Sequence, residues 1–122
     1  MLALPVQREL ETHSPMSTVL RALRAAIGLA ESDIERLTES GPGTTRRWLK
    51  GSASPRAESA DRIDQLRCIV VVLGDSSLEP ENIVAWLRNR NPHLEWRRPL
   101  DVLVAGDFDA VLKEAKSVRE VV

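Results

Sequence analysis

Hydrophobic residues recur at helical spacing in three short stretches of the N-terminal half. These stretches predict a first helix that begins at Met16-Ser17, with Ser17 as its N-cap, and runs up to Gly28, and further helices over residues 31–39 and 44–50. Glycines separate them, because Gly28 and Gly51 follow the first and the third, and a Gly-Pro-Gly turn at 41–43 precedes the third. Residues 1–15 hold two prolines and scattered charges without a sustained period, and we expect a loose arm there.

The longest helical pattern covers residues 57–73. It begins apolar on one face and ends apolar nearly all round. Such widening indicates that the helix leaves one small core and enters another, or that it forms a dimer seam. The run of valines could instead indicate a strand, but the chain offers no second strand candidate to pair with it.

Proline and glycine also punctuate the C-terminal third. An amphipathic stretch over 81–89 ends before Asn91-Pro92, since the residue before a proline is pushed out of the α region. Pro99 can begin the next helix, at the position where its missing N–H costs nothing. Gly106 ends that helix, and the Asp107 carboxylate can cap a final one. We therefore predict an all-α fold, a small helical bundle of about seven helices.

The charge is distributed unevenly. The net charge of −1 argues against nucleic-acid binding by the chain as a whole. Residues 42–56, however, carry four basic side chains and no acidic one. A basic island on a mildly acidic body suits a local anion contact, although a solvated loop would carry the same charges.

Residues 31–50 have the layout of a helix-turn-helix, in which the second helix can enter the DNA major groove. In that layout Thr45 and Trp48 face the core. The residues left toward solvent or DNA are Gly43, Thr44, Arg46, Arg47 and Lys50. The arginine forks match guanine edges, whereas the threonine and the lysine suit phosphates better.

Three positions depart from the usual helix-turn-helix pattern. Glu35 stands where a small residue is usual, Glu39 where a glycine is usual, and Thr45 where a valine or isoleucine is usual. The two carboxylates would also repel phosphates. The alternative is a helical bundle whose basic island is only solvated.

Several motifs occur in one order in the last third: the aromatic stretch 86–94 with its Asn-Pro, then Pro99-Leu100-Asp101, then Gly106-Asp107 and the valine-leucine helix after it. This order resembles the toxin-binding domain of the Xre/MbcA/ParS antitoxin family. The stretch from Leu29 to Trp48 resembles the Xre-type helix-turn-helix. The resemblance implies four segments: the arm 1–15, a helix-turn-helix at 16–56, a connecting or dimerisation helix at 57–74, and a toxin-binding domain at 75–122.

The resemblance implies a cytoplasmic antitoxin of a type II toxin–antitoxin system, whose partner is a RES-domain toxin that consumes NAD. The C-terminal end of the antitoxin would then lie at or near the active-site mouth of the toxin, which makes residues 113–122 the inhibitory segment. The apolar pair at 121–122 fits a segment that plugs the active site of the toxin, and it fits a frayed terminus equally well. The implied toxin-binding residues are Arg88, Arg90, His93, Arg97, Arg98, Lys113, Lys116, Arg119, Glu120, Val121 and Val122. The apolar residues of this region, Trp96 among them, read most simply as core, and we accept this interpretation for most of them.

Operator DNA is the second expected partner, with autorepression by a homodimer or a toxin–antitoxin hetero-oligomer. The dimer follows from the overlong apolar helix and from the symmetry of DNA half-sites. Two alternatives stay open: a stand-alone Xre-type transcriptional regulator whose C-terminal module dimerises, and an interaction module with a vestigial DNA-binding unit.

The residue inventory argues against an enzyme. With two histidines and one cysteine, the chain offers no spacing that suggests a metal site. Ser76 and Ser77 beside Asp75 read as a turn and cap, not as nucleophiles. We expect no cofactor and no metal. Cys68 excludes an internal disulfide, its apolar run is too short to span a bilayer, and no export signal is visible, so a cytoplasmic protein without a membrane partner is expected.

Overall fold

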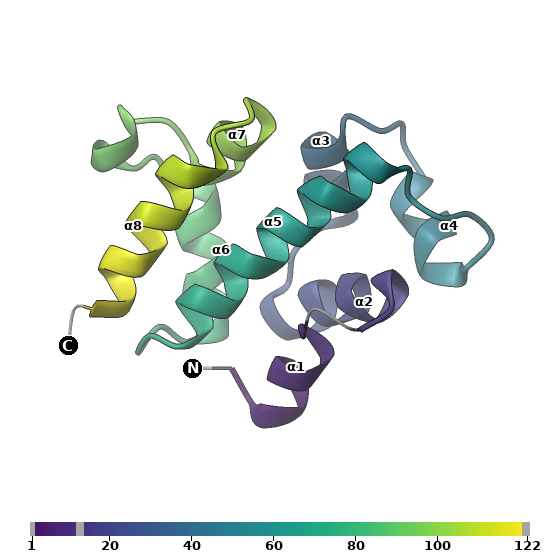
Figure 1. Cartoon of the computed structure of the whole chain (residues 1–122), viewed down its shortest axis with the longest axis horizontal. Helices are drawn as coiled ribbons and strands as arrows, with labels where there is room; N and C mark the ends of the chain where they lie inside the picture. Colours follow the sequence, from purple (N-terminus) through teal and green to yellow (C-terminus); the bar gives the residue numbers. More distant parts are fainter. Residues whose placement is uncertain (1, 12–13, 121–122) are drawn as a thin grey trace.

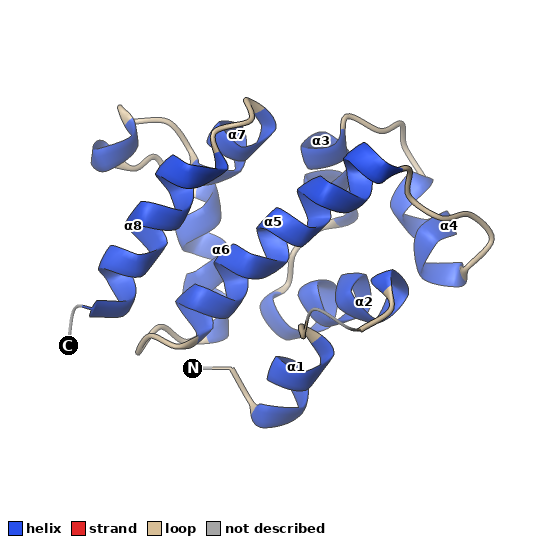
Figure 2. Ribbon diagram, in the orientation of Figure 1, coloured by secondary structure: helices blue, strands red, loops and turns tan. Residues whose placement is uncertain are grey.

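The computed structural model describes residues 2–11 and 14–120. Within these ranges the chain forms eight α-helices and one 3-10 helix, and no strand longer than an isolated bridge (Figure 2). The elements are α1 Leu4–Glu9, α2 Met16–Ile27, α3 Glu31–Thr38, α4 Thr44–Lys50, α5 Ala57–Gly74, α6 Pro80–Arg88, the 3-10 helix η1 Pro92–Leu94, α7 Pro99–Val104 and α8 Phe108–Glu120. The predicted all-α class is confirmed.

Helix boundaries follow the glycine and proline signals. Gly43 and Gly51 flank α4 with φ values of 81° and 77°, a left-handed conformation that glycine adopts without steric cost. Pro99 opens α7. The Asp107 Oδ1 atom accepts a hydrogen bond of 3.2 Å from the Ala110 N–H and so caps α8. Local chemistry therefore sets where these helices begin and end.

The N-terminal segment differs from the loose arm expected for it. It contains α1, and Leu2 and Leu10 on either side of that helix are buried. Leu2 packs on Gly74, where a Cβ atom would come within 2.7 Å of the leucine Cδ1. Arg67 also donates a 3.1 Å hydrogen bond to the Leu10 carbonyl. The prediction was wrong because the two anchoring leucines lie outside the helix and produce no helical period.

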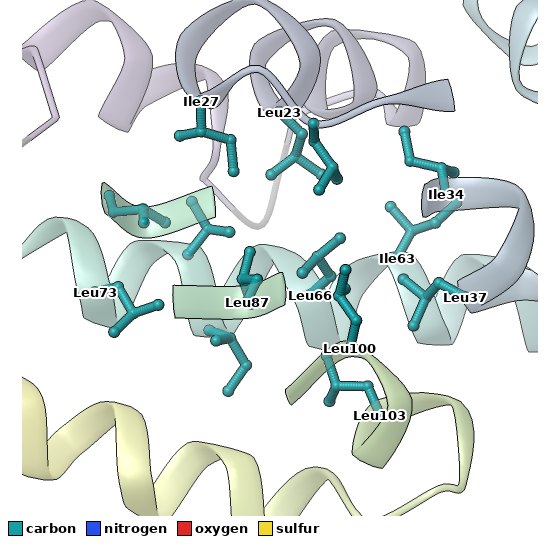
Figure 3. Packing of buried hydrophobic residues seen from close by; sticks show 14 of the residues in the cluster. Leu23, Ile27, Ile34, Leu37, Ile63, Leu66, Leu73, Leu87, Leu100 and Leu103 are labelled. Carbon is teal, nitrogen blue, oxygen red and sulfur yellow. The ribbon is translucent and has the colours of Figure 1, made fainter. Parts of the chain in front are cut away.

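Helix α5 runs through the middle of the molecule and contacts α2, α3, α6, α7 and α8 (Figure 1). Its buried residues belong to one continuous core with residues from both ends of the chain, several of which Figure 3 shows pointing into a shared interior. The apolar end of α5 is thus covered by the chain itself, with Val70 and Leu73 buried and Cys68 half-buried. This end therefore no longer supports a dimer.

The two predicted binding surfaces lie far apart. Helix α4 is at one end of the long axis, whereas the loop between α6 and α7 and the last turns of α8 are at the other (Figure 1). Helices α3 and α7 meet between them. Across residues 2–11 and 14–120, no helix combines the length and the apolar character needed to cross a membrane.

Candidate functional site

Helix α4 is held by a polar crossing contact with α3. Thr45 has 0% of its surface exposed, and Trp48 is buried beside it, as predicted. The Thr45 N–H donates to Glu35 Oε2 at 3.1 Å, and the Thr45 hydroxyl donates to the Glu31 carbonyl at 3.3 Å. The Glu35 carboxylate thus lies at the N-terminus of α4, where it satisfies a free N–H and offsets the helix dipole. Glu35 and Thr45 therefore replace the usual apolar crossing with a hydrogen-bonded pair.

The outward side of α4 collects the predicted DNA-binding residues. Gly43, Arg46, Arg47 and Lys50 are exposed, and Thr44 is half-buried. Arg46 is 67% exposed and its Nε atom lies 3.6 Å from a Glu31 oxygen, a separation at which an exposed ion pair is weak. Arg47 donates to the Thr44 hydroxyl at 3.1 Å. We call these five residues the α4 surface.

Glu39 ends α3 in the conformation that glycine prefers. Its φ of 55° and ψ of 42° place it in the left-handed region, where a residue with a Cβ atom is strained. The turn is closed by hydrogen bonds from the Glu39 and Ser40 N–H groups to the Arg36 and Glu35 carbonyls. The unusual glutamate of the sequence therefore occupies a position whose backbone suits a glycine.

Replacing Glu39 with glycine is expected to stabilise the chain by about 1 kcal/mol, because it removes the left-handed strain at a helix C-terminus. The melting temperature should rise by about 4 °C. The matched control is Glu39→Ala, which removes the same charge but keeps the Cβ atom and should not raise the melting temperature. Equal stabilisation by both variants would contradict a backbone origin.

A groove of about 410 Å³ lies at the other end of the molecule. The end of α6, the segment that follows it and the outer part of α8 form its walls. Its lining residues are Trp86, Asn89, Arg90, Asn91, Pro92, His93, Glu114, Ser117 and Val118. We call it the C-terminal groove. Two of the predicted toxin-binding residues, Arg90 and His93, meet here with Glu114, Ser117 and Val118 of α8, which belong to the predicted inhibitory segment 113–122 but were not among its named binding residues.

The loop 91–97 next to this groove is closed by its own hydrogen bonds. The Asn91 N–H donates to the Arg97 carbonyl at 3.0 Å, and the Trp96 N–H donates to the Asn91 carbonyl at 2.9 Å. The Asn91 side chain accepts from the His93 N–H at 2.9 Å, and Arg90 donates to the Trp96 carbonyl at 3.1 Å. Leu94 is the buried anchor of the loop.

Trp96 lies outside the core, contrary to the assignment made from its hydrophobicity. It is 63% exposed. Glu95 and Trp96 both have positive φ, 59° and 62°, and the buried apolar residue of this turn is Leu94 instead of the tryptophan. The charged neighbours Glu95, Arg97 and Arg98 were a sequence signal for exposure, since a core segment would not place a tryptophan among them.

Two other predicted toxin-binding residues form ion pairs within the chain. The Arg88 guanidinium lies 2.6 Å from Asp33, and Arg98 lies 3.8 Å from Asp101, which also pairs with Arg36 at 2.8 Å. These contacts join α3 to α6 and α7. The structure therefore separates Arg88 and Arg98 from the C-terminal groove, and their acidic partners already offset part of their charge.

The remaining predicted toxin-binding residues lie on the loop and on α8. Arg97 is exposed, and its Nε atom donates to the Leu94 carbonyl at 3.1 Å. Helix α8 buries Val111 and Ala115, and its exposed side presents Lys113, Lys116, Arg119 and Glu120. Val121 and Val122 lie outside the described residues. In the part of the chain that is described, no cluster of three or more His, Cys, Asp or Glu side chains could hold a metal ion.

Comparison with known proteins identifies the family. The family model described as the antitoxin Xre/MbcA/ParS C-terminal toxin-binding domain matches residues 70–114. The probable mycobacterial cidal antitoxin Rv3188 of Mycobacterium tuberculosis is 32% identical over 101 residues, which cover 83% of this chain and 84% of that protein. The chain belongs to the Xre/MbcA/ParS antitoxin family.

Further relatives agree with this assignment. The mycobacterial cidal antitoxin MbcA of Mycobacterium bovis is 26% identical over 104 residues, covering 85% of this chain and 90% of that protein. A chain in the crystal structure of the M. tuberculosis MbcT–MbcA toxin–antitoxin complex has the same fold, with a TM-score of 0.75 at 21% identity over 88% of this chain and 96% of that one. In this Xre/MbcA/ParS antitoxin, the matched residues 70–114 contain the loop 91–97 and most of the groove lining.

Proposed function

We propose that this chain neutralises a toxin protein by binding it directly through its C-terminal end. The observation that carries the proposal is the toxin-binding-domain match over residues 70–114, which falls on the part of the fold with the C-terminal groove and the exposed loop 91–97. The mechanism needs no chemistry by the antitoxin itself, because a bound protein can exclude substrate by covering a cleft. The chain then acts without a cofactor and is not an enzyme.

The toxin in this proposal is a RES-domain enzyme that consumes NAD, and the inhibitory segment is residues 113–122. Support comes from the sequence resemblance and from the arrangement of α8. That helix packs on α5 along its inner side, so Lys113, Lys116 and Arg119 are free to meet acidic or polar groups of a partner. Antitoxin and toxin would meet in the cytoplasm.

Co-expression with the product of the neighbouring gene tests the proposal. We expect that product alone to arrest growth and lower cellular NAD, and co-expression of this chain to restore both. The two proteins should also purify as one complex. Growth arrest that this chain does not relieve, or the absence of a complex, would contradict a toxin-neutralising role.

Deletion of residues 119–122 is expected to leave the fold intact, because Arg119 and Glu120 are exposed at the end of α8. Neutralisation should weaken by about tenfold or more if this segment reaches the active site of the toxin. Inhibition of purified toxin by increasing antitoxin measures the effect. The matched control is Lys50→Ala at the opposite end of the molecule, which should inhibit as the unaltered chain does. Full inhibition by the truncated chain would rule out the plug.

Autorepression through the α4 surface is the second proposed function. Helix α4 carries Arg46, Arg47 and Lys50 and no acidic residue, and these three side chains are exposed. A homodimer, or a hetero-oligomer with the toxin, would place two such helices on paired half-sites. A stand-alone regulator would bind DNA but no toxin. An interaction module with a vestigial DNA-binding unit would bind a protein partner but not DNA.

A further inference from the structure

Trp96 is an exposed aromatic residue with no role in the core. It is 63% exposed, and among the side chains that the structure describes it is the one large hydrophobic residue that is exposed. Tryptophan provides a large contact area with only two rotatable side-chain bonds. It is enriched among the few residues that dominate binding energy at protein interfaces. Trp96 lies beside the C-terminal groove, at the end of the molecule that binds the toxin in the proposed function.

The backbone at this position is strained. Glu95 and Trp96 follow each other with φ values of 59° and 62°, a conformation that side chains with a Cβ atom rarely adopt and that glycine adopts freely. Folding stability alone would therefore favour glycine at both positions. The exposed indole contributes little to folding stability, because it is not packed in the core. Contact with another molecule would account for a tryptophan at this position.

The loop that carries Trp96 is already fixed in one geometry. Hydrogen bonds join Asn91 to Arg97 and to Trp96, and Arg90 holds the Trp96 carbonyl at 3.1 Å. The buried Leu94 fastens the middle of the loop to the core. A side chain presented on an ordered loop loses less conformational entropy when it binds, which favours affinity.

The surrounding charge indicates the kind of surface that Trp96 meets. Arg90 and Arg97 donate to main-chain carbonyls, and neither guanidinium forms an ion pair among the residues that the structure describes, although Glu114 lines the same groove as Arg90. Glu95 is the one carboxylate in the sequence from 88 to 98. A second copy of this chain would set these arginines against each other in a symmetric contact, which is unfavourable. A partner with an apolar pocket bordered by carboxylates matches the surface better.

We propose that Trp96 is the anchor through which this antitoxin binds its toxin, entering an apolar pocket bordered by carboxylates. The inference rests on the proposed function and adds to it a binding residue and the chemistry of its site. It also assigns Arg90 and Arg97 two tasks, since they hold the loop and attract the acidic border of the pocket. Affinity should accordingly fall as salt is added.

The test compares two glycine variants, Trp96→Gly and its matched control Glu95→Gly. Both remove backbone strain, so both should fold and melt at or above the temperature of the unaltered chain. The purified product of the neighbouring gene is the binding probe, and calorimetry gives the dissociation constant. Loss of the indole should weaken binding by about 30-fold or more, whereas Glu95→Gly should stay within about threefold. Trp96→Phe should retain part of the affinity.

The other possible results distinguish failure of the anchor from failure of the proposed function. If the unaltered chain does not bind the neighbouring product, the proposed function fails and the anchor fails with it. If the unaltered chain and Trp96→Gly bind equally well, the anchor is wrong while the proposed function stands. Weaker self-association or weaker DNA binding by Trp96→Gly, with toxin affinity unchanged, would assign the indole to those contacts and overturn the inference.

Discussion

Replacing Leu66 with alanine is expected to lower the free energy of unfolding by about 3 kcal/mol. Leu66 has 0% of its surface exposed, on the central helix α5. It shares one buried cluster with Leu23 of α2, Leu87 of α6 and Leu100 of α7 (Figure 3). The substitution removes buried methyl groups and leaves a cavity between helices from both ends of the chain. A loss of this size is a large part of the stability of a domain of this length.

Hydrogen exchange measured during denaturation distinguishes a single shared core from two cores that unfold independently. With a shared core, amides of α3 and of α8 should lose protection together in the Leu66→Ala variant. Val71→Ala, on the same helix but only partly buried, should cost about 1 kcal/mol or less and serves as the control. Loss of protection in α3 while α8 stays protected would show that the predicted segments fold as separate units.

Replacing Arg46 and Arg47 together with alanine is expected to weaken operator binding by about 100-fold, since an arginine contact with DNA contributes about 1–3 kcal/mol. Both side chains are exposed on α4, and neither supports the core. The logarithm of affinity should also depend less steeply on the logarithm of salt concentration, with the slope reduced by about 2. Titration of the DNA upstream of the gene at several salt concentrations measures both effects.

The control removes the same charge from the other end of the molecule. Lys113→Ala combined with Lys116→Ala changes two exposed cations of α8. This variant should bind DNA as the unaltered chain does and inhibit the toxin less well, whereas the α4 variant should show the reverse pattern. Unchanged DNA binding by the α4 variant would indicate that the helix-turn-helix is vestigial.

Local sequence signals predicted most of the secondary structure because glycine, proline and capping side chains act within a few residues. The bounds of α4 and the start of α7 follow from such signals, as does the Asp107 cap of α8. Helix α1 was missed because it is anchored by contacts distant in sequence: the buried Leu2 packs on Gly74, and Arg67 donates a hydrogen bond to the carbonyl of the buried Leu10. The order of motifs in the last third was sufficient to predict the family.

The candidate binding surfaces were predicted less completely. The outward position of Arg46 and Arg47 followed from the helical period, since Thr45 and Trp48 had to face the core. No periodicity could show that Arg88 pairs with Asp33, because 55 residues separate the two in sequence. Hydrophobicity alone placed Trp96 in the core, whereas the hydrogen bonds that close its loop place it in solvent.

By itself the sequence determined the helical class, the punctuation of the helices and membership of the antitoxin family, because these depend on neighbouring residues and on motif order. The tertiary structure decided which charges are paired within the chain and that α8 forms one wall of the C-terminal groove. It also decided that the apolar end of α5 is covered by the chain itself. Those properties depend on contacts between residues far apart in sequence, and such contacts exist only once the core around α5 has brought both ends of the chain together.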